Sequence, residues 1–419
     1  MNKNTKMVVF DDDPTGIQTV HGCLLVTDWS EENIIEAMND SEPFFYVLTN
    51  TRALTASEAE SVLESAVEAV LRVNEKLGYR LICVSRSDSC LRGHFPLETD
   101  IIRRTLEKHG IKVWQRTPFC PAFIESGRVT IEGVHYMKVP SASGMAVEET
   151  LVPVSETEFA RDNVFGYKNS VLTEYIKEKG GNPDDYEIVN AESYAELDAF
   201  RDKLFAETKD FDGAVVIRSS SSLPRSMSGI CDKPYLSRED LGIKGDTPGV
   251  FIVGSHVRKT TIQLENLLTA DTVRGIELPI ERILDDKERL MAETIGTMSA
   301  VFRDGKSPVV FTARKEVRID DPEKRQHLGR TVSDFLVDIV RNLPFTPAYL
   351  VAKGGITSHD ILTKGLAIKV GRVMGQAINS VPCVMAEKFG YIIFPGNVGG
   401  EKSLLYIHEK FKAPRPESI

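Results

Sequence analysis

Three consecutive aspartates, Asp11, Asp12 and Asp13, follow the apolar run at residues 7–10. Such a run predicts a strand covered on both faces, and α/β proteins bind ligands beyond the carboxyl ends of strands of this kind. Crowded carboxylates repel one another unless a cation, a basic side chain or a substrate hydroxyl compensates them. The segment is therefore a candidate for a general base that takes a proton from a substrate hydroxyl. A solvated turn is the simpler alternative, because Pro14, Thr15 and Gly16 follow at once.

A second chemical interpretation makes Asp11 the nucleophile and Asp13 the acid/base of a phosphatase of the haloacid-dehalogenase type. That pattern has glycine directly after the second aspartate, where this chain has Pro14. It also needs a later acidic pair at a strand end, and the pairs at residues 285–286 and 320–321 lie in polar segments. The sequence therefore favours the general base over the nucleophile.

Arginines and serines follow two further predicted strands. Arg52 comes after the run at 44–48, and the run at 81–84 leads into a polar loop that contains Arg86, Ser87, Asp88, Ser89 and Arg92. An arginine fork binds a carboxylate through two parallel hydrogen bonds, while hydroxyls and backbone amides reach the remaining oxygens. These loops predict an anionic, hydroxylated ligand, although phosphate would use the same groups. A helix N-cap with solvated arginines is the simpler alternative.

Three glycine loops in the second half each follow a predicted strand. Gly254 and Ser255 follow the run at 250–253, the sequence KGGITS at 353–358 follows the run at 349–351, and PGNVGG at 395–400 follows the run at 391–394. Glycines let backbone amides approach phosphate oxygens, so the loops predict a nucleotide or phosphate site, with tight turns as the alternative. Residues 396–403 nearly match the phosphate-loop motif, but Glu401 replaces its second glycine.

The elements that must position these residues alternate along the chain. Strands are expected at 7–10, 44–48, 81–84, 214–217, 250–253, 309–312, 349–351 and 391–394. Helices are expected at 55–77, where Thr55 and Glu58 form a capping box, and at 331–343 and 358–364. This alternation predicts an α/β fold of two domains, each with a largely parallel sheet flanked by helices. Residues 140–200 are expected to form an excursion or cap on the first domain, and the Pro- and Gly-bearing segment 233–249 a linker.

Composition limits the partners. The 419 residues carry a net charge of −10, which argues against nucleic acid but leaves room for a local anion site. The six cysteines are scattered, so neither a disulfide framework nor a structural zinc site is expected. No stretch of the sequence is apolar enough to span a membrane, and the first residues do not resemble a targeting segment. We therefore expect a cytoplasmic enzyme.

Together these segments resemble the four-carbon acid sugar kinase family, which includes 3-oxo-tetronate, threonate and erythronate kinases. Residues 12–16, DDPTG, are similar to the family signature Asp-Asp-x-Thr-Gly, and residues 86–93, RSDSCLRG, to Lys-x-Asp-Ser-Thr-Leu-Arg-Gly. The resemblance extends through residues 118–136 and the three glycine loops. The departures lie on the substrate side: Asp11 stands where Ala is common, Arg86 replaces Lys, Cys90 replaces Thr and His94 replaces Asn.

The resemblance implies an acid-sugar-binding domain at 1–245, a nucleotide-binding domain at 246–419 and an active-site cleft between them. The expected reaction is ATP-dependent phosphorylation of a hydroxyl of a four-carbon sugar acid, with Asp13 or Asp12 as base and Mg²⁺ accompanying the nucleotide. A homodimer is a candidate assembly, and a non-catalytic sugar-acid sensor is a remaining alternative. The expected substrate contacts are Thr15, Gly16, Arg52, Arg86, Ser87, Asp88, Ser89 and Arg92. The expected nucleotide contacts are Ser255, Gly354, Gly355, Ile356, Thr357, Gly396, Asn397 and Gly399.

Overall fold

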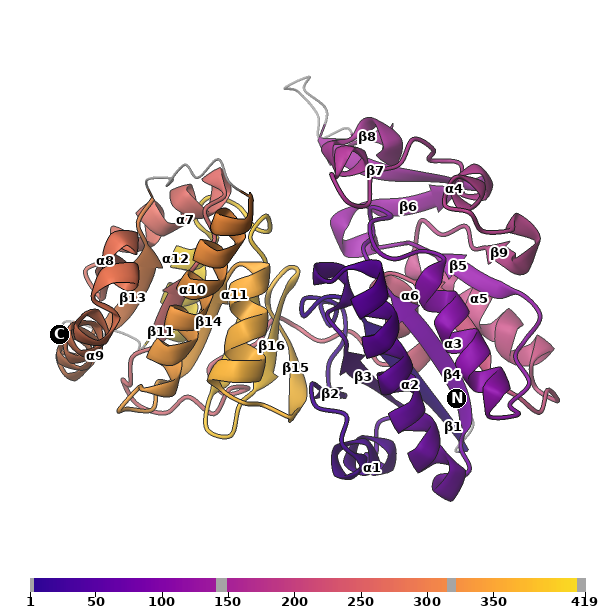
Figure 1. Cartoon of the computed structure of the whole chain (residues 1–419), viewed down its shortest axis with the longest axis horizontal. Coiled ribbons are helices and arrows are strands. Elements are labelled where there is room, and N and C mark those ends of the chain that lie inside the picture. The colour runs from indigo at the N-terminus through magenta and orange to yellow at the C-terminus, as the bar shows by residue number, and fades with distance from the viewer. Residues whose placement is uncertain (1–3, 141–148, 315–321, 413–419) are drawn as a thin grey trace. The chain divides into compact units, whose positions relative to one another are not determined.

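The computed structural model describes residues 4–140, 149–314 and 322–412. The chain divides into two compact units, Met1–Asp232 and Lys233–Ile419, and each is described by itself. Strands alternate with helices in both units (Figure 1). The two-domain α/β architecture predicted from the sequence is therefore confirmed.

The first unit is built on a parallel sheet. In spatial order its strands are β2 (Leu24–Val26), β3 (Phe44–Leu48), β1 (Thr5–Asp11), β4 (Arg80–Arg86), β10 (Val215–Ser219), β5 (Thr117–Cys120) and β9 (Tyr186–Ile188). Each pair of neighbouring strands in this order is parallel. All residues of β1, β3 and β10 are buried, which explains their nearly continuous apolar sequences.

Helices cover this sheet in two groups (Figure 1). Helix α2 (Ala56–Leu77) packs against α1 (Glu31–Asn39) and α3 (Leu97–Lys108), while α5 (Tyr194–Glu207) packs against α6 (Ser222–Ser228). Helix α2 begins with the expected capping box: Glu58 N donates to Thr55 Oγ1 at 3.4 Å, and Thr55 N donates to Glu58 Oε2 at 2.9 Å. Gly78 ends the helix in the left-handed conformation, at φ 72°.

The excursion expected at residues 140–200 belongs to a longer insertion in the first unit. Strands β6 (Arg128–Ile131) and β7 (Val134–Pro140) come before the expected start and form a separate antiparallel sheet with β8 (Glu149–Pro153), and α4 (Leu172–Glu178) follows. Tyr167, Tyr175 and Ile176 share one buried cluster with Leu91 and Phe95. The excursion therefore packs directly on the loop that carries the predicted arginines.

The second unit has a mixed sheet. Its strands run β12 (Val273–Leu278), β13 (Ser307–Thr312), β11 (Val250–Val253), β14 (Tyr349–Lys353), β17 (Gly390–Phe394), β16 (Val381–Met385) and β15 (Val370–Ile378). The first five are parallel, and β16 and β15 continue the sheet antiparallel. The core cluster includes Phe251, Val253, Tyr349, Val351 and Phe394 from three adjacent strands.

Helices of the second unit also form two groups. Helix α7 (Arg258–Leu268) packs against α12 (Ser403–Phe411), and α10 (Pro322–Arg341) packs against α8 (Ile280–Asp285), α9 (Lys287–Arg303) and α11 (Gly355–Asp360). A π-helical turn, Ile361–Gly365, continues α11. Short 3₁₀ turns occur at Thr51–Ala53, Ile124–Ser126, Val154–Glu156, Glu158–Arg161 and Pro183–Asp185.

Residues 233–249, interpreted from composition as a linker, pack on the second unit. Leu236 and Leu241 are buried in its core cluster, and Leu236 N donates to Gln376 O at 2.8 Å. Residues 233–249 are therefore a packed connection, and their prolines and glycines shape its path.

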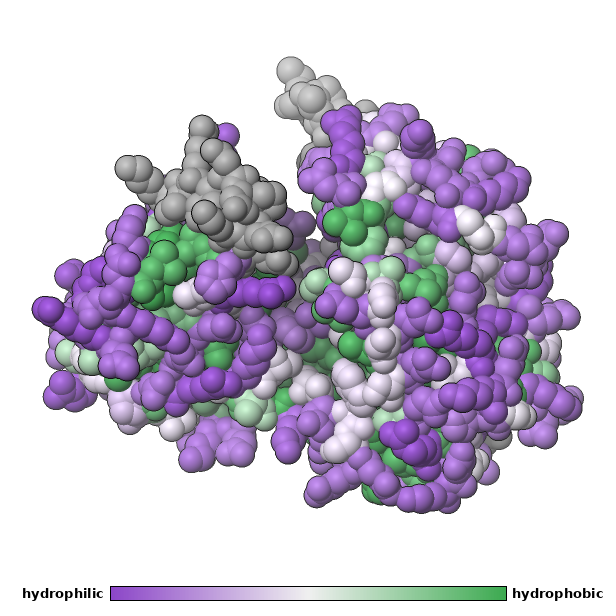
Figure 2. All heavy atoms as spheres, viewed as in Figure 1, coloured by the Kyte–Doolittle hydropathy of each residue, from purple (hydrophilic) through white to green (hydrophobic). Residues whose placement is uncertain are grey.

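Most of the surface visible in Figure 2 is hydrophilic. Within the described ranges, no helix combines the length and apolarity needed to cross a membrane.

The capping box of α2 provides a test of the local structure. We expect Thr55→Ala to lower the free energy of unfolding by about 1 kcal/mol, because Glu58 N loses its acceptor, Thr55 Oγ1, and the Glu58 carboxylate loses the bond from that hydroxyl. Chemical denaturation would measure the change. Ser57→Ala, at an exposed position within the same helix turn, is the control and should leave stability within about 0.5 kcal/mol of the parent. Equal effects of the two substitutions would contradict a stabilising cap.

Candidate functional site

The carboxyl ends of β1, β3, β4 and β10 meet at one edge of the first unit's sheet. Asp11 lies opposite Leu48 on one side and Arg86 on the other, and Arg86 lies opposite Ser219. Backbone hydrogen bonds continue past the strands: Asp12 N donates to Arg86 O at 3.2 Å, and Thr49 N donates to Asp11 O at 2.9 Å. Loops that are far apart in sequence are thereby held side by side.

Arg52 links two of the three aspartates. Its Nε donates to Asp12 Oδ2 at 3.0 Å, its Nη2 donates to Asp12 Oδ1, and its Nη1 donates to Asp13 Oδ2 at 3.2 Å. Asp12 is buried and also accepts a hydrogen bond from Ser87 Oγ at 2.5 Å. Asp13 is the more accessible of the two, since its side chain is 23% exposed against 1% for Asp12.

The second oxygen of Asp13 is held by the turn that follows it. Thr15 donates to Asp13 Oδ1 from its backbone N at 2.8 Å and from its Oγ1 at 2.5 Å. Burial raises the pKa of this carboxyl, but the charges of Arg52 and Arg86 and the bonds from Thr15 outweigh it. The pKa of Asp13 is therefore below its ordinary value. The site thus presents an ionised, partly accessible carboxylate.

Asp11 forms a separate, deeper ion pair with Arg86. Arg86 Nη1 donates to Asp11 Oδ1 at 3.1 Å, and its Nη2 donates to Ser221 Oγ at 2.9 Å. Burial raises the pKa of Asp11 to about 7 in spite of the arginine. Asp11 Oδ2 has no hydrogen-bond partner among the described residues, and a side chain at Gly16 would overlap this carboxylate. Gly16 therefore allows the turn to close over Asp11.

Asp88 and Arg92 form the third ion pair of the cluster. Arg92 donates to Asp88 from Nε at 2.8 Å and from Nη2 at 3.2 Å, and its Nη1 lies 3.7 Å from Asp162. The Phe159 ring lies under the guanidinium, 4.9 Å from its carbon. Burial opposes ionisation of Asp88, but Arg52 and Arg92 overcome it and lower its pKa. Asp162 and Phe159 come from the excursion, so that segment helps to hold Arg92.

Sequence reasoning missed a buried pair below this cluster. Arg218 Nη1 donates to Glu98 Oε2 at 2.5 Å and to Ser85 Oγ at 2.7 Å, and Thr51 Oγ1 donates to Glu98 Oε1 at 2.7 Å. Both charged side chains are 4% exposed. The four serines at 219–222 follow a predicted strand and were a usable signal, since Ser221 contacts Arg86. Glu98 carried no such signal.

The structure therefore brings Asp12, Asp13, Arg52, Arg86 and the polar loop at 87–92 to one sheet edge. Ser89 differs from the others in its contact with the antiparallel sheet: its carbonyl accepts a hydrogen bond from His135 of β7, at 2.8 Å. In the described ranges, no group of three or more His, Cys, Asp or Glu side chains is arranged to hold a metal ion. Mg²⁺ that accompanies a nucleotide is held by one or two carboxylates together with phosphates and waters, so this finding concerns only a metal site built entirely from protein side chains.

The carboxyl ends of β11, β14 and β17 meet at one edge of the second unit's sheet. Lys353 lies opposite Val253 on one side and Phe394 on the other, so the three glycine loops begin in one row. The loops touch closely: a side chain at Gly254 would overlap Thr357 Oγ1, and a Cβ at Gly354 would lie 3.1 Å from Ser255 Cβ. Gly354 has φ 120°, which glycine adopts without strain.

Polar side chains tie the last loop to α7. Thr260 Oγ1 donates to Gly396 O at 3.1 Å, Lys259 Nζ donates to Asn397 O at 3.0 Å, and Gln263 Nε2 donates to Val398 O at 3.0 Å. Arg314, which follows β13, donates to Ser255 O at 2.6 Å. None of these four side chains was predicted, although Arg314 follows a predicted strand as Arg52 and Arg86 do.

Three predicted nucleotide contacts face open space. A Cβ added at Gly355 meets no atom within 4 Å, the Ile356 side chain is 72% exposed, and Asn397 is exposed. Ser255 and Gly396 adjoin, since a Cβ at Gly396 would lie 3.1 Å from Ser255 Oγ. Gly399 has a different role: it allows a turn of the chain, with φ 83°, and it packs so closely on Ser403 that a side chain at this position would overlap Ser403 Oγ. Accessible backbone next to cationic side chains is suited to binding phosphate oxygens.

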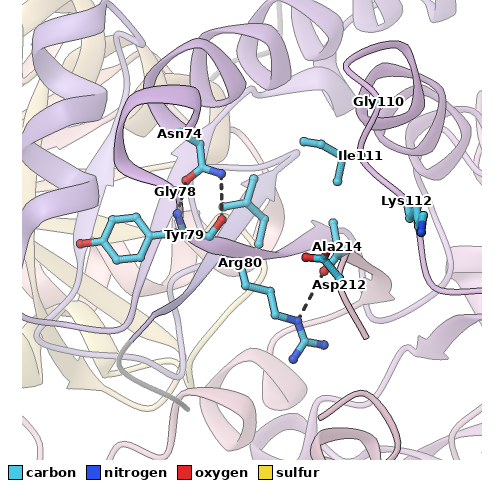
Figure 3. A pocket seen from close by; sticks show the side chains of 11 residues that line it. Asn74, Gly78, Tyr79, Arg80, Gly110, Ile111, Lys112, Asp212 and Ala214 are labelled. Carbon is cyan, nitrogen blue, oxygen red and sulfur yellow. Dashed lines mark hydrogen bonds between the residues drawn. The ribbon is translucent and has the colours of Figure 1, made fainter. Parts of the chain in front are cut away.

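A cavity of about 380 Å³ lies at the opposite edge of the first unit's sheet (Figure 3). It is lined where β4 begins, at Arg80 and Leu81, and by Ala214 directly before β10. Asn74 braces its wall, donating to Tyr79 O at 2.8 Å and accepting from Tyr79 N at 3.0 Å. Ligands of parallel sheets bind at carboxyl ends, so this cavity is not the candidate site.

Two family models match the chain. A sugar-binding N-terminal domain matches residues 7–220, and a nucleotide-binding C-terminal domain matches residues 250–404. The two models cover the two sheet edges described above. Comparison with curated proteins gave no match.

Solved structures of similar fold align with nearly all of the chain. A protein of family DUF1537 from Haemophilus influenzae aligns with a TM-score of 0.66 and 16% identity, covering 96% of this chain and 100% of that chain. A putative tRNA synthase from Salmonella typhimurium LT2 aligns with a TM-score of 0.69 and 16% identity, covering 98% of this chain and 100% of that one. At this identity the likeness concerns the fold.

The open position of Gly355 gives a test of the glycine loops. We expect Gly355→Val to fold normally, because the new side chain meets no protein atom, and to lose measurable ATP binding, because it occupies the space above the loop. Titration calorimetry and thermal unfolding would measure the two properties. Gly296→Val, exposed in α9 with equally open surroundings, should bind ATP normally. Unchanged ATP affinity in Gly355→Val would remove this loop from the site.

Proposed function

The chain belongs to the four-carbon acid sugar kinase family, and from this premise we propose that it transfers the γ-phosphoryl group of ATP to a hydroxyl of a small sugar acid. The matched models give it a sugar-binding domain followed by a nucleotide-binding domain. A four-carbon acid of the threonate, erythronate or 3-oxo-tetronate type is the first candidate substrate.

The observation that carries the proposal is the state of Asp13. It is the partly exposed carboxylate of the aspartate run, and Arg52 and Thr15 hold it ionised and oriented. In the proposed step, Asp13 takes the proton of the substrate hydroxyl, whose oxygen forms a bond to the γ-phosphorus. The bond from that phosphorus to its bridging oxygen breaks, and ADP leaves. Asp12, fully buried, orients Arg52.

The arginines divide into two proposed roles by their accessibility. Arg52 and Arg92 are 18% and 24% exposed and are proposed to meet the substrate carboxylate, while Asp88 and Thr15 meet its hydroxyls. Arg86 is 4% exposed and bonded to Asp11 and Ser221, so its effect on substrate is indirect. Gly16, Ser87 and Ser89 are proposed to shape the loops around the sugar acid.

The glycine loops of the second unit are the proposed phosphate-binding elements. Ser255, Gly354, Gly355 and Gly396 would present backbone and hydroxyl donors, with Ile356, Thr357, Asn397 and Gly399 beside them. Backbone amides suit this role because they carry partial positive charge and need no reorganisation when the phosphates bind.

The phosphatase interpretation has less support. Its nucleophile, Asp11, is completely buried, paired with Arg86 and covered by Gly16, so a phosphorus atom has no path to its oxygens. Of the later acidic pairs, Asp285 ends helix α8 with Asp286 after it, whereas residues 320–321 lie outside the described ranges.

An ADP-release screen tests the proposed function. Threonates, erythronates and 3-oxo-tetronates would each be incubated with the protein, ATP and Mg²⁺, and ADP would be followed by a coupled assay. We expect turnover on at least one acid well above the rate of ATP hydrolysis without acceptor. Acid binding without ADP formation would favour a sensor, and phosphate release from sugar phosphates without ATP would favour the phosphatase.

The same assay tests the role of Asp13. Asp13→Asn should lower kcat by about 10²-fold or more, because the amide cannot accept the hydroxyl proton, while the dissociation constant for ATP stays unchanged. Asp210→Asn, an exposed aspartate after α5, is the control and should retain full activity. Near-normal turnover in Asp13→Asn would show that another group is the base.

A further inference from the structure

Lys353 is a completely buried lysine at the end of β14. Its Nζ donates to Pro395 O at 2.6 Å, lies 3.5 Å from Val398 O, and sits 3.8 Å from the centre of the Phe394 ring. These contacts of Nζ are with the glycine loop at 395–400 and the strand before it. Among the described residues, no carboxylate forms an ion pair with this ammonium group.

The charged groups nearby do not supply the missing counter-charge. From α7, Lys259 is the group that acts on Lys353 electrostatically, and it has the same sign. Arg314, after β13, directs its guanidinium to Ser255 O. Carbonyl oxygens and an aromatic face compensate an ammonium group only in part, and burying a charge without an opposite charge costs several kcal/mol.

Burial, with a further contribution from Lys259, lowers the pKa of Lys353 to about 7. Near neutral pH the unliganded protein therefore holds this side chain in both its charged and its neutral form. A ligand that brings negative charge to the adjacent loop would shift this balance toward the charged form. Gly396, next to the carbonyl that accepts from Lys353, is a proposed phosphate contact.

We propose that Lys353 is a positioning residue that holds the 395–400 loop for nucleotide phosphates and that nucleotide binding drives its protonation. The inference rests on the proposed function, because it assumes that phosphates bind this loop. Lys353 itself does not touch the phosphates; it acts through the carbonyl of Pro395 and through its charge. Binding of a nucleotide by the wild-type protein near pH 7 should then take up a fraction of a proton.

Titration of the whole protein with ADP, in buffers of different ionisation enthalpy, measures this uptake without needing a sugar acid. Between pH 6.5 and 8.5 the wild-type uptake should rise, and ADP affinity should fall by up to about tenfold per pH unit above the pKa. The sign follows because the bound state carries more protons than the free state. Protons that ADP itself takes up or releases contribute equally to the wild type and to the variants described below, so the comparison between these proteins removes that contribution.

Two substitutions separate charge from packing. Lys353→Arg keeps a permanent cation, so it should bind ADP without the Lys353-linked proton uptake and with a flatter pH profile. Lys353→Met keeps the length of the side chain without the charge; it should be at least as thermally stable as the wild type at pH 7 and bind ADP about tenfold more weakly. Lys259→Met is the matched control: it should weaken ADP binding while proton uptake remains, with the uptake shifted to higher pH because Lys259 no longer lowers the pKa of Lys353.

The outcomes distinguish this inference from the proposed function. If ADP binds and the wild type takes up no more protons than Lys353→Met, the inference is wrong and the kinase proposal stands. If Lys353→Met lowers kcat with unchanged ADP affinity, Lys353 does not position the nucleotide loop. If the wild type binds neither ATP nor ADP, both proposals are overturned.

Discussion

The parallel pairing of β1 with β3 and β4 constrains the whole first site. Because Asp11 is held in register with Leu48 and Arg86, the chain segments that leave these strands must begin within two strand spacings of one another. The contacts of Arg52 with Asp12 and Asp13, and of Arg86 with Asp11, follow from that adjacency. The second unit repeats the constraint with β11, β14 and β17, so that Lys353 stands between Val253 and Phe394.

The cationic side chains at the two sheet edges have different partners. In the first unit each arginine of the loops is already paired with an aspartate: Arg52 with Asp12 and Asp13, Arg86 with Asp11, and Arg92 with Asp88. An acid that binds there must exchange one carboxylate partner for another, which favours ligands whose geometry matches the existing pairs. In the second unit Lys353 and Lys259 bond to backbone carbonyls, so a bound anion adds a charge that the described side chains do not supply.

The sequence predicted strands that are buried on both faces and run parallel, because such strands read as continuous apolar runs. It did not predict β15, whose buried and partly exposed residues alternate, or β16, in which Pro382 argues against a strand. Nor did it predict β12, where Arg274 and Glu277 interrupt the apolar pattern of the strand at the end of the sheet order. These strands pair through tertiary contacts that local sequence does not encode.

The sequence by itself determined which residues stand at strand ends, because apolar runs and the polar residues after them are local properties. It thereby indicated the aspartate run, the arginine loops and the glycine loops. Only the tertiary structure decided what each residue meets: Arg218 pairs with Glu98 across 120 positions, Asp11 is buried while Asp13 is partly exposed, and the excursion supplies Phe159 and Asp162 to Arg92. Burial and pairing depend on the packing of distant segments, and the charge state of each group follows from them.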